Sequence, residues 1–258
     1  PSQWFSGVYA IYKEIPNATL DLYWLWLCER NDLPTRLDGN RHTIGARMAG
    51  NEPVLTEGDQ TLLTFDWELE GGYQFGRDDV GTVPDLDVRA GFISTNTGFT
   101  FKSLPWSPSL AYIFFWGSGD RDPTDGVSGT FSTLYPLGHA HWGQIDNFSG
   151  SNLQNHALQL TVRPVDKLSL QMQYHFFSKD QAADAIYNVA GARLGNLTTA
   201  STSLGQELDF VGTLQLNKNL QLQAGYFWFW YGDAVTGNAG LPPRDDAQQF
   251  YFMTTWTF

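Results

Sequence analysis

The chain has 258 residues, of which 42% are hydrophobic, 15% aromatic and 16% charged, a composition that excludes a disordered chain. No stretch reaches the ~18 consecutive apolar residues that a membrane-spanning helix requires, so a helical membrane protein is excluded. The net charge of -12, with only 15 Lys and Arg residues, argues against a nucleic-acid partner because phosphate binding needs concentrated cations.

The first residues and the cysteine count add two expectations. The segment from Pro1 to Trp4 lacks the basic and apolar regions of a secretory signal, so we expect a mature, trimmed or partial chain. Cys28 is the single cysteine, which excludes an internal disulfide framework and a cysteine-rich metal site.

From its N-terminus onward the chain consists of segments of roughly ten residues in which apolar and polar positions alternate, separated by Gly, Pro, Asn and Asp. This pattern predicts antiparallel strands, each with one apolar and one polar face. In the first half the expected apolar faces are Leu20, Leu22, Trp24 and Trp26; then Phe65, Trp67, Leu69, Tyr73 and Phe75; then Val88, Ala90 and Phe92.

Two hairpins and a final strand follow in the second half. The hairpins turn within residues 163–167 and 217–219. The expected apolar faces are Leu158, Leu160, Val162, Leu168, Leu170, Met172, Tyr174 and Phe176 around the first turn; Leu208, Phe210, Leu214, Leu216, Leu220, Leu222, Ala224, Tyr226, Trp228 and Trp230 around the second; and Phe250, Phe252, Thr254, Trp256 and Phe258 in the final strand.

Strand length separates a membrane barrel from a soluble sandwich, which also alternates. Sandwich strands average about five or six residues, whereas membrane-spanning strands need ~9 to 11. The segments here are of the longer kind, and aromatic residues cluster at the ends of their apolar faces, as in interfacial girdles. A final amphipathic strand ending at Phe258 resembles the C-terminal signature of bacterial outer-membrane barrels. We predict an all-β, antiparallel transmembrane β-barrel of the outer-membrane type, forming one domain over residues 1–258.

Loop lengths alternate as such a barrel requires, with short periplasmic turns and long extracellular loops. Short turns are expected at 13–17, 163–167 and 217–219, and long loops near 118–152, 179–205 and 232–246. About eleven strands result if residues 138–146 belong to a loop, and twelve if they cross the membrane. Because bacterial barrels have even strand counts, eleven predicts a larger barrel whose N-terminal strands are missing, whereas twelve predicts a complete small barrel.

Two segments resemble the alginate export family of outer-membrane porins: Leu63 to Gly76, with the sequence LTFDWELEGGYQFG, and Gly117 to Gly126, with GSGDRDPTDG, followed by Gly129-Thr130-Phe131 and Leu134-Tyr135-Pro136. The resemblance covers most of the chain and is most specific between residues 62 and 146. It implies the C-terminal portion of an eighteen-stranded barrel, located in the bacterial outer membrane, and passive passage of a solute such as the anionic polysaccharide alginate.

A polyanion pathway needs cations on the inner wall, because rings of charge set the selectivity of a pore. The alternation places Arg47, between Ala46 and Met48, and Arg89, between Val88 and Ala90, on the inner face. More numerous acids share these faces, namely Asp21, Asp66, Glu68, Glu70, Asp87, Glu207 and Asp209. These residues either set selectivity or form a structural ladder across neighbouring strands, and the excess of acids leaves cation preference open.

The run containing Asp120, Asp122 and Asp125, flanked by Gly119 and Gly126, has the oxygen density of a calcium loop. It lacks a complete calcium-binding motif, and turn formation by Asp and Gly is the alternative interpretation. Apart from this calcium, no cofactor is expected.

The spacing of Asp66, Glu68 and Glu70 overlaps the carboxylate separation of glycosidases, but three acids along a strand are more typical of a solvated wall, so we expect no enzyme. The predicted function is an outer-membrane channel that passes an anionic saccharide and contacts the lipid bilayer. The alternatives are a secreted all-β protein that binds carbohydrate or processes polysaccharide, and a cation-preferring or structural barrel with protein partners in an envelope complex.

Overall fold

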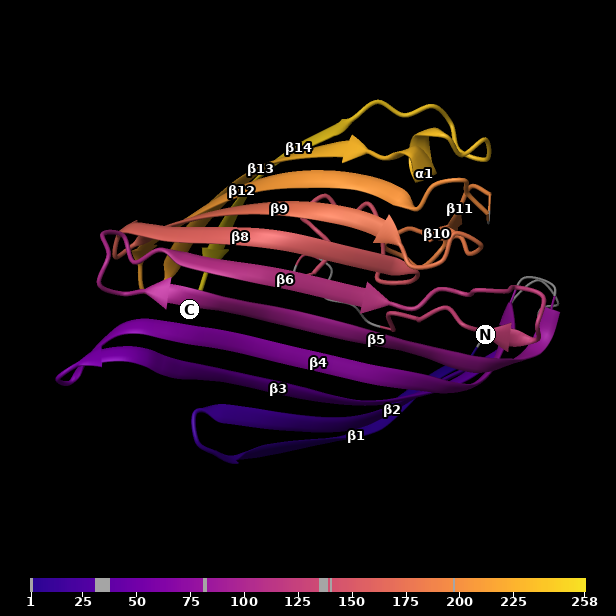
Figure 1. Cartoon of the computed structure of the whole chain (residues 1–258), viewed down its shortest axis with the longest axis horizontal. Coiled ribbons are helices and arrows are strands. Elements are labelled where there is room, and N and C mark those ends of the chain that lie inside the picture. The colour runs from indigo at the N-terminus through magenta and orange to yellow at the C-terminus, as the bar shows by residue number, and fades with distance from the viewer. Residues whose placement is uncertain (1, 31–37, 81–82, 135–138, 140, 197) are drawn as a thin grey trace.

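The computed structural model describes residues 2–30, 38–80, 83–134, 139, 141–196 and 198–258. Long antiparallel strands dominate it (Figure 1). They are β1 (Ser2–Ile15), β2 (Ala18–Arg30), β3 (Gly39–Glu57), β4 (Gln60–Val80), β5 (Val83–Phe101), β6 (Ser109–Gly117), β8 (Leu153–Val165), β9 (Leu168–Lys179), β12 (Ser203–Asn217), β13 (Leu220–Tyr231) and β14 (Ala247–Trp256). The short elements are β7 (Val127–Ser128), β10 (Ile186–Tyr187), β11 (Arg193–Leu194) and the helix α1 (Asp233–Thr236).

The long strands form one sheet in the order β1-β2-β3-β4-β5-β6-β8-β9-β12-β13-β14. The sheet has 12 strands, and β7, which pairs with β5 in parallel, is the one outside this path. Eleven consecutive strands therefore remain, as the alternation of turns predicts. Residues 139 and 141–146, which decide between eleven and twelve strands, contain no strand. Along the described residues the sheet stays open between β1 and β14.

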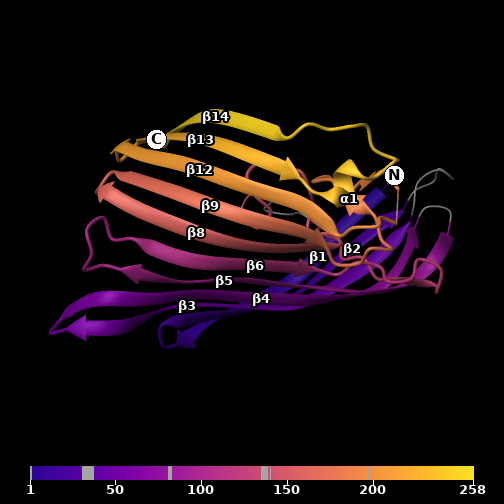
Figure 2. The same ribbon diagram turned by 45° about the horizontal axis from the view of Figure 1, so that its top comes forward.

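Turns and loops separate to opposite ends of the curved sheet (Figures 1 and 2). Tight turns join β1 to β2, β3 to β4, β8 to β9 and β12 to β13 at one end, where the C-terminus also lies. The long connections 118–152, 180–202 and 232–246 lie at the other end with α1. This asymmetry is typical of outer-membrane barrels.

The outer face of the sheet is an apolar belt, because side chains alternate across each strand. Large apolar side chains that alternation predicts to point outward are exposed on this face, including Leu22, Leu69, Leu158, Phe210 and Phe250. Aromatic rings stack on each other in the same face: His42 lies 5.8 Å from the ring centroids of both Trp24 and Trp26, and 5.2 Å from Phe75. The secreted two-sheet alternative would bury these faces in a dry core, which this single sheet does not do.

A hydrophobic core fills part of the inside of the sheet. Its buried members come from strands and from the long connections and α1, and they include Val88, Ala90, Phe115, Phe131, Trp142, Phe148, Leu153, Phe177, Ile186, Leu204, Phe229, Ala234 and Val235. The connections are thus folded against the inner wall. Among the described residues no helix is long and apolar enough to cross a membrane.

The prediction that Val88, Ala90 and Phe92 form an outer face is wrong. Val88 and Ala90 are 2% exposed and belong to the inner core. Phe92 lies 4.9 Å from Phe131, ring centroid to ring centroid. Alternation identifies the two faces of this strand correctly, but here the apolar face packs on a folded connection instead of lipid.

Candidate functional site

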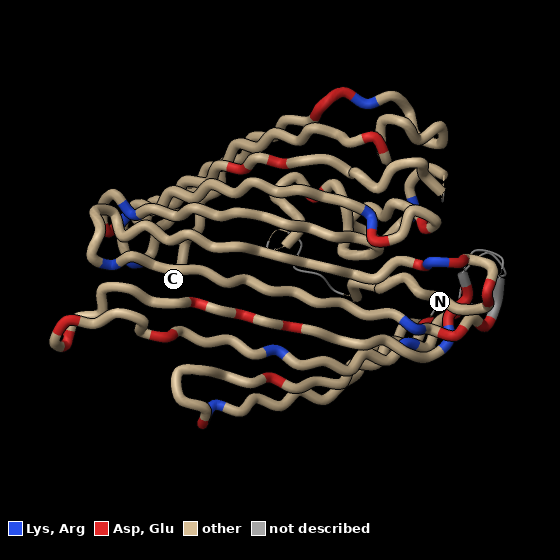
Figure 3. Tube along the Cα trace, viewed as in Figure 1, with Lys and Arg blue, Asp and Glu red and all other residues tan. Residues whose placement is uncertain are grey.

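The inner wall of β2, β3 and β4 brings sequence-predicted charges together. The pairing of the strands places Asp21 opposite Arg47 and Arg47 opposite Glu70. The carboxylate side chains of Asp66, Glu68 and Glu70 alternate along the middle of β4, and Figure 3 shows this acidic run in the middle of the strand, away from the charged residues at the ends of the sheet. The prediction that these residues share the inner face is confirmed.

Arg47 bridges two acids on the strands beside it. Its Nη1 lies 3.2 Å from Asp21 Oδ2 and its Nη2 lies 2.7 Å from Glu68 Oε2. The Arg47 side chain keeps 32% of its surface exposed. The arrangement therefore provides the cross-strand ladder that was one interpretation of these charges, and it leaves part of the Arg47 side chain exposed.

The other carboxylates of this wall are also held by neighbours. The Tyr9 hydroxyl donates to Asp21 Oδ2 at 2.8 Å, and the Tyr23 hydroxyl donates to Glu70 Oε1 at 2.7 Å. Asp66 accepts hydrogen bonds from the Asn51 amide and, at 2.9 Å, from the Thr100 hydroxyl. Tyrosine and amide donors therefore orient the acids without neutralising them.

The expectation that Arg89 and Asp87 line the lumen is wrong. Both alternate with the buried Val88 and lie on the outer face, where the Arg89 side chain is 64% exposed. Asp87 Oδ1 lies 3.0 Å from Arg77 Nε, and Asp87 Oδ2 lies 3.7 Å from Arg89 Nη2. Asp87 and Arg89 belong to a charged ladder with Arg77 on the outer face. They point outward because Val88, between them, points inward into the buried cluster that contains Phe131.

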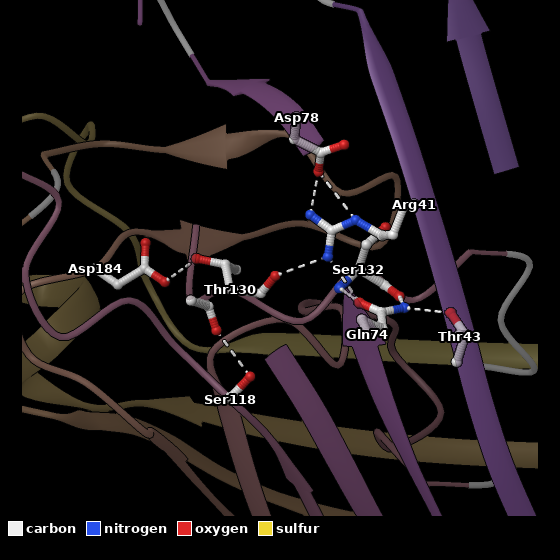
Figure 4. A network of polar contacts seen from close by, with 9 residues as sticks. Arg41, Thr43, Gln74, Asp78, Ser118, Thr130, Ser132 and Asp184 are labelled. Carbon is white, nitrogen blue, oxygen red and sulfur yellow. Dashed lines mark hydrogen bonds and ion pairs between the residues drawn. The ribbon is translucent and has the colours of Figure 1, made fainter. Parts of the chain in front are cut away.

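The connection between β6 and β8, residues 118–152, is here called the inner loop; its residues 135–138 and 140 lie outside the described chain. Arg41 and Gln74 fix one part of it to the wall (Figure 4). The Arg41 Nη1 donates to the Thr130 carbonyl at 3.1 Å and to Gln74 Oε1 at 2.7 Å. Gln74 in turn exchanges two hydrogen bonds with the backbone of Ser132, at 2.8 and 2.9 Å. An ion pair with Asp78 orients Arg41.

Glu207 fixes a second part of the inner loop from the opposite side. Its Oε1 accepts the backbone N–H groups of Gln144 at 2.6 Å and Ile145 at 2.9 Å. Gly143 sits at φ +80°, and an added Cβ would lie 2.6 Å from the Glu207 carboxylate, so the loop approaches the wall closely only because this residue is glycine. Glu207 and Asp209 face inward, as predicted, but their exposures of 0% and 1% place them beneath the loop.

Asp180 follows β9 and connects the start of the inner loop at Gly119, here called the loop rim, to β6 and β8. It accepts hydrogen bonds from Trp116 Nε1 at 2.8 Å, Gly119 N at 3.0 Å, Gln154 Nε2 at 3.1 Å and Gln181 Nε2 at 3.0 Å. Burial alone would raise the pKa of Asp180, but these donors outweigh it and hold the pKa below its usual value. The carboxylate is therefore ionised wherever the loop is docked at neutral pH.

The predicted calcium residues form successive turns. Asp120 Oδ1 accepts the Asp122 N–H at 3.1 Å, Asp122 Oδ1 accepts the Thr124 hydroxyl at 2.6 Å, and Asp125 Oδ1 accepts the Val127 N–H at 2.9 Å. Within the described ranges, no cluster of three or more His, Cys, Asp or Glu side chains is arranged to hold a metal ion. Calcium binding at this run stays a prediction.

A cavity of about 740 Å³ separates the inner loop from the wall of β1 to β5. The wall side presents aromatic and charged groups, and the loop side presents polar groups and buried rings. The lining includes Phe5, Tyr9, Tyr23, Arg47, Glu68, Glu70 and Asn96 from the wall, and Phe131, Ser132, Thr133, His141 and Trp142 from the loop. Burial lowers the pKa of His141, so its ring is uncharged at neutral pH.

Sequence reasoning missed Arg41, Gln74, Tyr9 and Tyr23. Arg41 shares the parity of Arg47 along β3, and Gln74 shares that of Glu70 along β4. The alternation could therefore have placed both on the inner face. Their contacts with the inner loop could not have been found this way, since those partners are 58 to 89 residues away in sequence.

Comparison with known proteins agrees with this architecture. A family model described as alginate export matches residues 1–242. The chain belongs to the alginate export family. Comparison with curated protein sequences gave no match. Among solved structures, the crystal structure of Pseudomonas aeruginosa OccK11 (OpdR) aligns with a TM-score of 0.51 and 15% sequence identity, covering 99% of this chain and 71% of that chain.

The identity to OccK11 is low enough that this likeness concerns the fold alone. With family membership it identifies the chain as an outer-membrane β-barrel channel of the alginate export type, located in the bacterial outer membrane. In this family member the inner loop covers the wall from the part of β5 around Val88 and Ala90 to β13. The cavity lies along β1 to β5.

We expect Glu207→Ala to release the inner loop around Gly143, because the two backbone hydrogen bonds to Glu207 Oε1 are lost, each worth about 0.5–1.5 kcal/mol. Chymotrypsin should then cleave after Trp142 at least about tenfold faster in detergent-solubilised protein. Leu208→Ala, on the outer face of the same strand, is the matched control and should leave cleavage unchanged. Equal cleavage of the wild type and Glu207→Ala would contradict the proposed anchoring.

Docking of the loop rim should weaken only in acid. Because the pKa of Asp180 is lower in the folded state than the value of about 3.9 in an unfolded chain, its stabilisation is fully present above that value and disappears as the pH falls through the folded pKa. Limited proteolysis of the rim at pH 7, 5 and 3 should show an increase only at pH 3. Asp180→Asn should be cleaved readily at all three values, and Asp59→Asn, in a turn at the other end, should match the wild type. An identical acid response in wild type and Asp180→Asn would sink this interpretation.

Proposed function

We propose that the channel lets a saccharide pass passively across the outer membrane, and that this saccharide is anionic, as the name of the alginate export family suggests. The observation that supports an anionic solute is Arg47, whose side chain borders the cavity and is about a third exposed. A guanidinium offers paired donors to a carboxylate such as that of a uronate.

Cation preference is the second candidate, and the charge of the same wall favours it. Asp21, Asp66, Glu68 and Glu70 share the inner face with Arg47, whereas Arg89 points outward. Carboxylate rings favour cations in a pore. Anion passage along this wall therefore depends on Arg47, which borders the cavity together with residues of the inner loop.

We also propose that the chain catalyses no reaction. The acids that resemble a glycosidase pair by spacing each support the wall: Glu68 pairs with Arg47, Glu70 accepts the Tyr23 hydroxyl, and Asp66 accepts Thr100. Passive passage runs down whichever gradient exists, and the lipid bilayer around the apolar belt is the partner that the fold requires. Protein partners in the envelope stay a proposal.

The test is single-channel conductance of the full-length, detergent-extracted protein in a planar bilayer, with and without an oligouronate. We expect anion selectivity, block by the oligouronate, and about tenfold weaker block in Arg47→Gln, since one charge-assisted contact is lost. Arg89→Gln is the matched control and should behave as the wild type, because Arg89 lies on the outer face. Cation selectivity without block would leave the channel standing, exclude the anionic solute, and assign selectivity to the acids of β4.

A further inference from the structure

We propose that the cavity between the inner loop and the β1 to β5 wall is a subsite for a single saccharide ring, which it holds by stacking on Tyr9 and by hydrogen bonds from the ring hydroxyls to Glu68, Glu70 and Asn96. The inference rests on the proposed passage of a saccharide and adds the side chains and the parts of the sugar that recognise each other. A cavity of about 740 Å³ lies within the range of pockets that enclose small ligands.

The aromatic side of the subsite comes from the inner face of β1. Tyr9 and Phe5 border the cavity and remain 54% and 44% exposed. The rings of Tyr9 and Tyr23 are parallel within 5°, with centroids 5.9 Å apart. An added Cβ at Gly45 would lie 2.4 Å from the Tyr23 ring, so glycine there lets Tyr23 lie flat on β3. The result is an ordered aromatic surface on the lumen side, as the apolar C–H face of a pyranose requires.

Hydrogen bonds hold these rings in place. The hydroxyl of Tyr9 is tied to Asp21, and that of Tyr23 is tied to Glu70. Each tyrosine therefore has its polar end satisfied by the wall. An aromatic ring that is fixed before binding loses little conformational entropy when a ligand stacks on it.

The polar side of the subsite has unused hydrogen-bonding capacity. Glu68 and Asn96 are directly opposite each other across β4 and β5, and both border the cavity. Glu68 gives one oxygen to Arg47, Glu70 gives one oxygen to Tyr23, and the Asn96 amide makes no side-chain hydrogen bond within the described residues. The remaining carboxylate oxygens accept, and the amide both donates and accepts, which matches the vicinal hydroxyls of a sugar.

The charge around Arg47 decides which part of the sugar these groups recognise. Arg47 lies between Asp21 and Glu68, and Glu70 adds a further carboxylate to the cavity. A uronate carboxylate that binds Arg47 therefore shares the guanidinium with Asp21 and Glu68. Hydroxyls and the C–H face are common to neutral and anionic sugars, so stacking and hydroxyl recognition should act on both kinds.

The test compares block of single-channel current by a neutral oligosaccharide and by an oligouronate of the same length, using the full-length protein. We expect both to block, and Tyr9→Leu to weaken block by both about tenfold, as loss of an aromatic contact would. Tyr9→Phe, which keeps the ring, should stay close to wild type. Asn96→Ala should also weaken both. Tyr12→Leu and Thr97→Ala, on the outer face of the same strands, are the matched controls.

The outcomes separate the subsite from the proposed function. If both saccharides block the wild type and neither Tyr9→Leu nor Asn96→Ala weakens this block, the subsite is overturned and the saccharide channel is kept. Block by the oligouronate alone, weakened by Arg47→Gln and not by Tyr9→Leu, would overturn it in favour of charge recognition. Current that neither saccharide blocks would overturn the saccharide function itself, together with the subsite.

Discussion

The need to pair every backbone N–H and C=O group inside a lipid bilayer determines this structure. In hydrocarbon no water can satisfy these groups, so strands must pair with neighbours along their whole length. Eleven consecutive strands pair in this way here, each antiparallel to the next, and within the described residues only β1 and β14 among these strands have an unpaired edge along the sheet. Pairing at this length fixes the alternation of side chains, and alternation gives each strand one apolar and one lumen face. The apolar belt, the Asp21–Arg47–Glu68 ladder and the anchors of the inner loop all depend on that register.

The inner loop covers one half of the inner face of the sheet and leaves the other half open to the cavity. Arg41 and Gln74 hold the loop from β3 and β4, and Glu207 holds it from β12. Phe131 packs on Phe92 of β5 and Phe115 of β6, and Phe148 packs on Phe177 of β9 and Phe229 of β13. Inward side chains of that half such as Phe177, Glu207 and Phe229 are buried, and the cavity lies along β1 to β5. The position of the loop, more than the composition of the wall, determines which inward residues a solute can reach.

The alternation of apolar and polar residues shows which side chains share a face of a strand, and this limits how much of the structure the sequence predicts. Alternation and strand length predict the fold class and the inward position of Arg47, Glu68 and Glu70, and loop lengths predict eleven or twelve crossings. They cannot show what covers a face. On β5 the apolar face meets Phe131 of the inner loop, so the inward assignment of Arg89 fails. On β12, Glu207 is placed correctly, but its contact with Gln144 and Ile145, 62 to 63 residues away, depends on the folding of the loop.

Accessibility of single cysteines to a charged thiol reagent tests most directly whether the lumen is divided. In a Cys28→Ser background, which removes the only native thiol, Asn96→Cys lies on the open wall and Gln173→Cys lies on the covered wall, where Gln173 is 5% exposed. We expect the reagent to reduce single-channel current in Asn96→Cys and to leave Gln173→Cys unaffected. Equal reaction at both positions would contradict a lumen divided by the inner loop.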